Sequence, residues 1–260
     1  MRSYRIKALM LRHWYVTISG IDRMFDLFFW PVFSLFLWGF TSLFIDSLGS
    51  TGFVVVIFIG GLMLWSIFDR AQKDVSIYII QDFWDRSVYN LYVTPMKESE
   101  LFVSVALFGL VRTTISFAIV AGLAFVGYGF NIFEVGVFNL ILFAIPLFIF
   151  GWAAGIFIAG LIFRYGARIS IITWSIPFFI QPIAAVFYPV SILPVSLQKL
   201  SLALPLVHVF EGFRAAMSNQ FLPKQFVWAI ALSLFYLVVC YFAFVWFVRH
   251  SKKTGFLSKQ

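Results

Sequence analysis

Two side chains suited to acid–base or metal chemistry lie three residues apart near the end of the sequence. His208 and Glu211 follow Pro205 in the segment PLVHVFEGFR, so a helix starting at that proline would place both on one face. Such a pair can exchange a proton or contribute to a metal site. Arg214 stands three residues beyond Glu211 and can pair with it, and no nucleophile accompanies the pair. We therefore expect structural roles for all three, with no catalytic residue and no metal site.

The elements that hold these residues are expected to be membrane helices. Hydrophobic residues make up 62% of the 260 residues and charged residues only 12%, against roughly 25% charged in a soluble domain. The single cysteine, Cys240, excludes an intrachain disulfide and a cysteine-based metal site. The lysines and arginines that give the formal charge of +8 lie at the ends of apolar runs. We therefore expect no nucleic-acid partner. The composition predicts an all-α integral membrane protein.

Six apolar segments are long enough to be transmembrane helices of about 20 residues. They are 24–45, 53–71, 101–126, 135–163, 169–188 and 226–248. Lysine and arginine concentrate before the first span, between the second and third, between the fourth and fifth, and after the sixth. The positive-inside rule then places both termini in the cytoplasm. No small-residue cleavage site follows a short apolar core, so we expect the N-terminus to be retained.

The first 20 residues predict a helix lying in the cytoplasmic interface of the membrane. Tyr4, Ala8, Leu11, Tyr15 and Ile18 form one helical stripe within residues 4–20, and basic residues flank it. The alternative is an irregular basic segment that leads into the first span.

A short amphipathic helix is expected in the cytoplasmic segment between the second and third spans, at about 82–94. Asp82 can cap it and Pro95 ends it. One face carries Trp84, Val88 and Leu91, while Asp85, Arg86 and Asn90 lie elsewhere on the helix. It can pass a push from a cytoplasmic partner to two membrane helices, or rest on lipid headgroups. The residues themselves leave both possibilities open.

Charged residues near the end of the second span either shorten that span or form an intramembrane polar network with the third. The network comprises Asp69, Arg70, Asp74 and Arg112, beside Lys73. Arg112 lies about ten residues into its span, or roughly 15 Å along a helix. A charge at that depth needs a partner, water or a route to the interface. We expect Arg112 to pair with Asp69; the alternative is that Arg112 extends to the interface.

Two further patterns concern packing and the path of the chain. Gly151, Gly155 and Ala159 form a small-residue strip, which favours close helix packing within the chain over a dimer interface. The segment 177–214 is interrupted by five prolines, which a plain span would not tolerate. We expect part of it to enter the membrane without crossing it.

The chain resembles, over nearly its whole length, the permease subunit of type-2 ATP-binding-cassette exporters. The basic N-terminal helix, the segment WDRSVYNLYVTPMKESE, and FYPVSILP followed by PLVHVFEGFRAAM carry the resemblance. It implies a homodimer, or less often a heterodimer, with two copies of a separate ATPase that holds ATP and magnesium. This sequence has no G-x-x-x-x-G-K-[ST] loop, so we expect no cofactor on it. It also implies a bacterial or archaeal cell membrane and an amphiphilic substrate: a drug or antibiotic, a lipid, or a lipid-linked glycan.

The resemblance assigns roles to two groups of residues. The segment 84–91 would be the coupling helix that contacts the ATPase, together with the loop from Arg164 to Arg168. Residues 191–217 would form an extracellular re-entrant helical hairpin between spans five and six. An outer gate would then comprise Pro189, Pro194, Pro205, His208, Glu211 and Arg214.

Three other function classes compete with this interpretation. An ion-coupled secondary transporter would favour inverted repeats with broken helices, and only one broken region is evident. A membrane enzyme would act through His208 and Glu211. A structural membrane scaffold would have little use for a charge as deep as Arg112.

Overall fold

The computed structural model describes residues 3–49, 53–84, 98–218, 220 and 222–253, and every regular element in these ranges is a helix. The α-helices are α1 (Ser3–Ser19), α2 (Ile21–Ser47), α3 (Phe53–Trp84), α5 (Glu98–Tyr128), α6 (Val137–Tyr165), α7 (Ile172–Ile183), α8 (Val195–Leu202), α9 (Pro205–Met217) and α10 (Pro223–Lys253). Three short 3-10 helices join them: η1 (Ile132–Val135), η2 (Ala167–Ile169) and η3 (Val190–Ile192). The expectation of an all-α protein is confirmed.

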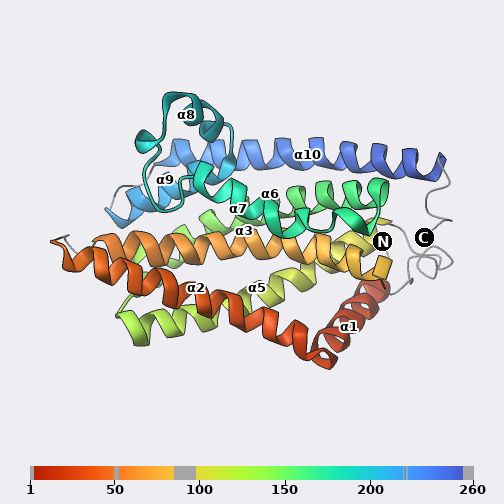
Figure 1. Ribbon diagram of the computed structural model, residues 1–260, viewed down its shortest axis with the longest axis horizontal. Helices are drawn as coiled ribbons and strands as arrows, with labels where there is room; N and C mark the ends of the chain where they lie inside the picture. The colour runs from red at the N-terminus through yellow and green to blue at the C-terminus, as the bar shows by residue number, and fades with distance from the viewer. Residues whose placement is uncertain (1–2, 50–52, 85–97, 219, 221, 254–260) are drawn as a thin grey trace.

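Five of these helices are long and apolar enough to cross a membrane. Their candidate spans are Phe28–Ser47, Val54–Tyr78, Val103–Tyr128, Val137–Tyr165 and Pro223–Ser251. The helices run roughly along the long axis of the molecule (Figure 1). The start of α1 and the end of α10 lie at one end of the bundle, and α8 and α9 lie toward the other. The chain is thus a multi-pass membrane protein, and five of the six predicted spans coincide with long helices.

Helix α3 is the centre of the bundle and is longer than expected. It packs against α2, α5, α6, α7 and α9, and its Phe68 is fully buried against Phe150 of α6 in the main core. No glycine or proline occurs after Gly61 in this helix, so it continues through the charged residues 69–74 and ends only at Trp84. The second span was predicted to end at Ala71, whereas α3 continues to Trp84, and Asp82 lies inside this helix.

The small-residue strip on α6 packs against other helices of the same chain. A Cβ atom at Gly151 would lie 2.7 Å from Ala71 Cβ, and one at Gly155 would lie 2.7 Å from Val75 Cβ, both on α3. Ala159 is buried in a cluster with Phe244 of α10. The absence of side chains lets the α3 and α6 backbones approach closely, so the prediction of intramolecular packing is confirmed.

The predicted fifth span, 169–188, contains only the 12-residue helix α7. Pro177 and Pro182 lie inside it, and the chain leaves helical geometry at Ala185, whose φ is +52°. At 1.5 Å per residue a 12-residue helix covers about 18 Å, short of the roughly 30 Å hydrocarbon core. Prolines remove backbone donors and limit further extension of the helix.

Helix α1 presents two different faces. Leu9, His13 and Thr17 recur at every fourth position and are buried, mainly against α5. The predicted stripe of Tyr4, Ala8, Leu11, Tyr15 and Ile18 is exposed. An exposed apolar stripe on a helix inclined to the bundle (Figure 1) is available to lipid. The alternative of an irregular lead-in is wrong.

Candidate functional site

A buried ion pair links the two helices that carry the predicted polar network. Arg112 Nη1 on α5 lies 2.7 Å from Asp74 Oδ1 on α3. The two side chains are 10% and 5% exposed. Both lie within candidate spans, where a charge is tolerated when it is paired inside the bundle. The structure thus places Arg112 inside the bundle, paired with Asp74.

The partner of Arg112 differs from the one expected. Asp69 instead accepts from Lys73 Nζ at 2.8 Å, across one turn of α3. Because α3 continues beyond Ala71, Asp74 is also inside the bundle. The glycine at position 109 of α5 leaves room for it: a Cβ there would lie 3.1 Å from Asp74 Oδ2. Arg70, the fourth predicted member, is buried on the same helix.

Helix α1 covers the end of this network with a histidine that sequence reasoning assigned no role. The ring of His13 lies 4.3 Å from that of Tyr78 and 5.7 Å from that of Phe108. Burial, followed by the charges of Arg12 and Arg112, lowers the pKa of His13 to about 4, so His13 is neutral at physiological pH. The spacing of His13 with Leu9 and Thr17 could have indicated a buried face of this helix. The aromatic stripe on the other face was the clearer pattern in the sequence.

A second charged contact also joins α1 to α5. Arg5 Nη1 lies 3.4 Å from Glu100 Oε2, and the Glu100 side chain is only 2% exposed. No sequence pattern singles out Glu100, because it stands in a polar segment where exposed carboxylates are common. Together with the His13 contacts, this pair fixes α1 onto the end of the bundle.

The segment for which a hairpin was predicted contains α8 and α9, two short helices that meet at 95°. The prolines stand at helix starts: Pro189 precedes η3, Pro194 precedes α8, and Pro205 is at the first turn of α9. A proline at the start of a helix loses no hydrogen bond and fixes a suitable φ. The prolines therefore divide the segment into separate short helices.

Arg214 on α9 holds the irregular chain that follows α7. Its Nη1 donates to the carbonyl oxygens of Ala185 at 3.0 Å and Val186 at 3.4 Å. Its Nη2 lies 2.9 Å from Glu211 Oε1, and the same carboxylate oxygen accepts from Val190 N at 3.0 Å. The pair Arg214–Glu211 thus supplies hydrogen-bond partners to the backbone at both ends of the irregular segment between α7 and η3. Backbone groups that are buried in an apolar environment require such partners.

Two hydroxyl groups complete the capping of α7. Ser201 Oγ of α8 donates to Ile183 O at 2.7 Å, and the Tyr188 hydroxyl donates to Pro182 O at 2.7 Å. The last carbonyls of a helix have no partner within the helix, and here side chains from the hairpin and the connecting segment supply the donors. These contacts attach α7 to the hairpin.

His208 does not form an acid–base pair with Glu211. Its Nε2 lies 3.1 Å from Leu202 O and its Nδ1 lies 2.6 Å from Gln225 Oε1 on α10. Both ring nitrogens of His208 thus have protein partners, and neither of them is Glu211. Glu211 is engaged by Arg214 and Val190 N. The two side chains therefore have structural partners in different elements.

Most of the predicted coupling residues lie outside the described residues. These are Asp85, Arg86, Val88, Asn90 and Leu91, whereas Trp84 is the last residue of α3. Arg168 is exposed in η2. Arg164, in the last turn of α6, stacks over Trp246 of α10 at 4.7 Å from the ring centroid. The structure thus separates the two arginines of this loop into different environments.

No protein-family model matches this sequence, and no curated protein shows significant similarity to it.

Proposed function

We propose that this chain is the permease subunit of an ATP-binding-cassette exporter for an amphiphilic substrate, with ATP and magnesium bound by a separate ATPase. The observation that carries the proposal is the bent pair α8–α9, attached to the irregular end of α7 by Arg214 and Ser201. It lies at the end of the bundle opposite the start of α1 and the end of α10 (Figure 1). The resemblance of the sequence assigns an outer gate to this hairpin.

In this proposal α7 and residues 184–186 together make a sixth crossing. Ile172 and Ile176 pack against the cluster of Ile80, Ile158 and Ile162, while Val186 O lies 3.0 Å from the Cβ position of Gly61. Ile80 and Gly61 are separated on α3 by a rise of about 28 Å. This segment thus covers nearly the depth of a bilayer core. Six crossings put both termini on one side, which charge assigns to the cytoplasm.

The proposed mechanism transmits force from the ATPase to the hairpin. Two copies of the chain would associate around a central path, with two ATPase subunits contacting 84–91 and the exposed Arg168. Movement of the end of α3 would pass to α5 through the pair Asp74–Arg112, and to α7 and α9 through the packed core. No residue of this chain performs a covalent step in this scheme.

The deciding experiment asks whether the chain needs an ATPase and whether 84–91 binds it. Affinity purification of the full chain from its native membrane should recover an ATPase whose activity rises with transported substrate. Deleting 84–91, or replacing Arg86 with glutamate, should abolish transport while the ATPase stays folded. Lys199→Glu, at the hairpin end, is the matched control and should have no effect on association. ATPase binding that survives the deletion would contradict the proposal.

One observation favours an ion-coupled transporter as the second candidate. Ionisable side chains inside a membrane bundle, such as Asp74 with Arg112, often mark a path for ions or protons. Reconstitution without ATP separates the two candidates: a secondary transporter moves substrate under an ion gradient alone. Asp74→Asn would then abolish the dependence on that gradient.

A further inference from the structure

The ends of α6 and α10 carry two arginines, Arg164 and Arg249, that form no ion pair within the described part of the chain. The sequence contains no aspartate or glutamate between Glu134 and Glu211, and none after Glu211. Arg164 and Arg249 therefore have no carboxylate on α6, α7 or α10, and they form an ion pair with none of the described residues. Elsewhere, Arg5, Lys73, Arg112 and Arg214 are each paired with a carboxylate.

Aromatic rings hold Arg164 in a fixed orientation. Its guanidinium lies 4.7 Å from the Trp246 ring centroid, 5.1 Å from that of Tyr165 and 5.6 Å from that of Phe247. Cation–π contacts of this kind hold the guanidinium without cancelling its charge, so it can still attract an anion. The His250 ring is stacked on the same indole at 5.8 Å and 26°.

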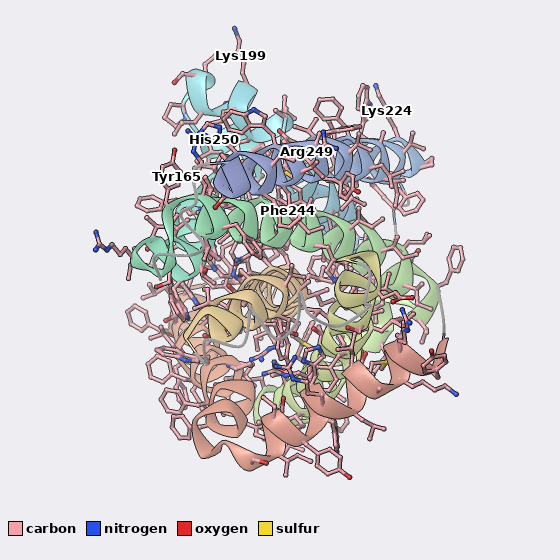
Figure 2. The ribbon with its side chains drawn as sticks, turned by 90° about the vertical axis from the view of Figure 1, so that its right-hand side faces the viewer. Tyr165, Lys199, Lys224, Phe244, Arg249 and His250 are labelled. Atoms are coloured by element: carbon pink, nitrogen blue, oxygen red, sulfur yellow. The ribbon has the colours of Figure 1, made fainter. Side chains whose placement is uncertain are left out.

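The backbone beneath these side chains is fixed as well. Ser251 Oγ of α10 donates to Phe163 O of α6 at 2.8 Å, and a Cβ at Gly160 would lie 3.1 Å from Phe244 Cα. The two helix ends are thus locked in register. Figure 2 looks onto this end of the bundle and shows Arg249 and His250 at the end of α10, with Tyr165 at the neighbouring end of α6.

An exposed apolar stripe leads from this cluster along α10. Phe235, Val239, Phe242 and Trp246 recur at helical spacing and are 60%, 46%, 66% and 55% exposed. From Phe235 to Trp246 the helix rises about 16 Å, roughly half of a 30 Å hydrocarbon core. The stripe is therefore one leaflet long and ends at the cationic residues.

We propose that Arg164, Trp246, Arg249 and His250 form a binding site for the phosphate headgroup of an anionic membrane lipid, whose acyl chain lies along the stripe on α10. The arginines bind the phosphate, and the stripe matches the length of an acyl chain in one leaflet. The positive-inside rule assigns this end to the cytoplasmic leaflet, where anionic lipids are found. This inference requires that the chain lies in a membrane and is independent of how transport is driven.

The test measures lipid binding by the purified full-length chain. Native mass spectrometry would compare retention of phosphatidylglycerol with that of phosphatidylcholine. Each of Arg164→Gln and Arg249→Gln should weaken the preference for phosphatidylglycerol about fivefold, from the attraction of one basic residue to an anionic surface. Arg249→Lys should retain it. Lys199→Gln and Lys224→Gln, from the opposite end of the bundle, are the matched controls and should leave it unchanged.

Three outcomes would overturn the assignment. The first is equal phosphatidylglycerol binding by the wild type and by the Arg164→Gln, Arg249→Gln double variant. The second is displacement of the lipid by inorganic phosphate at constant ionic strength, which would assign the site to a soluble anion. The third is an Arg164→Gln variant that loses ATPase association but keeps its lipid preference. A different result would contradict the proposed function: ATPase binding that survives deletion of 84–91.

Discussion

At the scale of single residues, the most consequential feature is that Arg112 and Asp74 are both inside the bundle and depend on each other. Removing one partner leaves the other charge buried without compensation, which costs about 3–5 kcal/mol. We expect Arg112→Leu and Asp74→Leu each to destabilise the protein by that amount, measured by SDS-induced unfolding in mixed micelles. The double variant should recover most of the loss, because no isolated charge remains.

Lys73→Ala is the control for that experiment. It breaks a pair whose side chains are 21% and 26% exposed, and such pairs contribute about 0–1 kcal/mol. Equal effects of Lys73→Ala and Arg112→Leu would mean that the pair Asp74–Arg112 has no special role.

Arg214 is the second residue with a predicted effect. Arg214→Leu removes the donor to the Ala185 and Val186 carbonyls, and hydrogen bonds to a charged group contribute about 2 kcal/mol. Hydrogen exchange of the backbone amides in 184–190 should therefore accelerate about thirtyfold. Lys199→Gln, on the exposed side of α8, should leave the exchange unchanged. Unaltered exchange in Arg214→Leu would show that the segment is held by other contacts.

Sequence reasoning at this scale selected the right charges more often than the right partners. Arg112, Asp74, Glu211 and Arg214 were all singled out, and the spacing of Glu211 and Arg214 correctly predicted their pairing. The partner of Arg112 was wrong because it depends on where α3 ends. Contacts between distant elements, such as Ser201 with Ile183, leave no local pattern in the sequence.

At the scale of elements, the close packing of α6 on α3 gives a sharp test. Gly155→Leu would force a side chain against Val75 and the Gln72 carbonyl, where even a Cβ would lie at 2.7 and 2.8 Å. Overpacking of this kind costs about 1–3 kcal/mol or more. We expect a lower melting temperature in detergent. Gly122→Ala is the control: no atom lies within 4 Å of its Cβ position, so it should be neutral or slightly stabilising.

The docking of α1 should depend on pH through His13. Its pKa is lowered to about 4 in the docked state, whereas an exposed histidine titrates near 6.5. The undocked helix thus binds the extra proton between these values, and docking weakens as pH falls from about 6.5 toward 4. Limited proteolysis within α1 should accelerate across this window. His13→Phe should remove the pH dependence, and the same dependence in that variant would contradict the assignment to His13.

Long apolar helices were predictable because a run of about 20 consecutive apolar residues is typical of a membrane-spanning helix. Their ends were less predictable, and α3 shows why: charged residues inside a bundle look the same in sequence as charged residues beyond its end. The short length of α7 was hard to predict for a related reason. Its apolar residues continue without a break into the irregular segment that follows, so the sequence does not mark where the helix ends.

At the scale of the whole molecule, the proposed topology is open to direct labelling. In a Cys240→Ser background, Lys199→Cys should react with an impermeant maleimide added to intact cells, because α8 lies at the end assigned to the outside. Arg168→Cys, exposed at the other end, should react only after the cells are opened. Lys224→Cys, at the start of α10, should behave like Lys199→Cys. Reversed labelling would invert the orientation and remove the cytoplasmic coupling role of 84–91.

The contacts between α7 and the hairpin have a consequence for the order in which the chain is made. The donors to the carbonyls at Ile183, Ala185 and Val186 are Ser201 and Arg214, which are synthesised later than the carbonyls themselves. At about 5–20 residues per second, Arg214 follows Ala185 from the ribosome by a few seconds. During that interval the end of α7 has no protein partner for these groups and must keep them hydrated. Entry of this segment into the bundle therefore waits until α9 has been made.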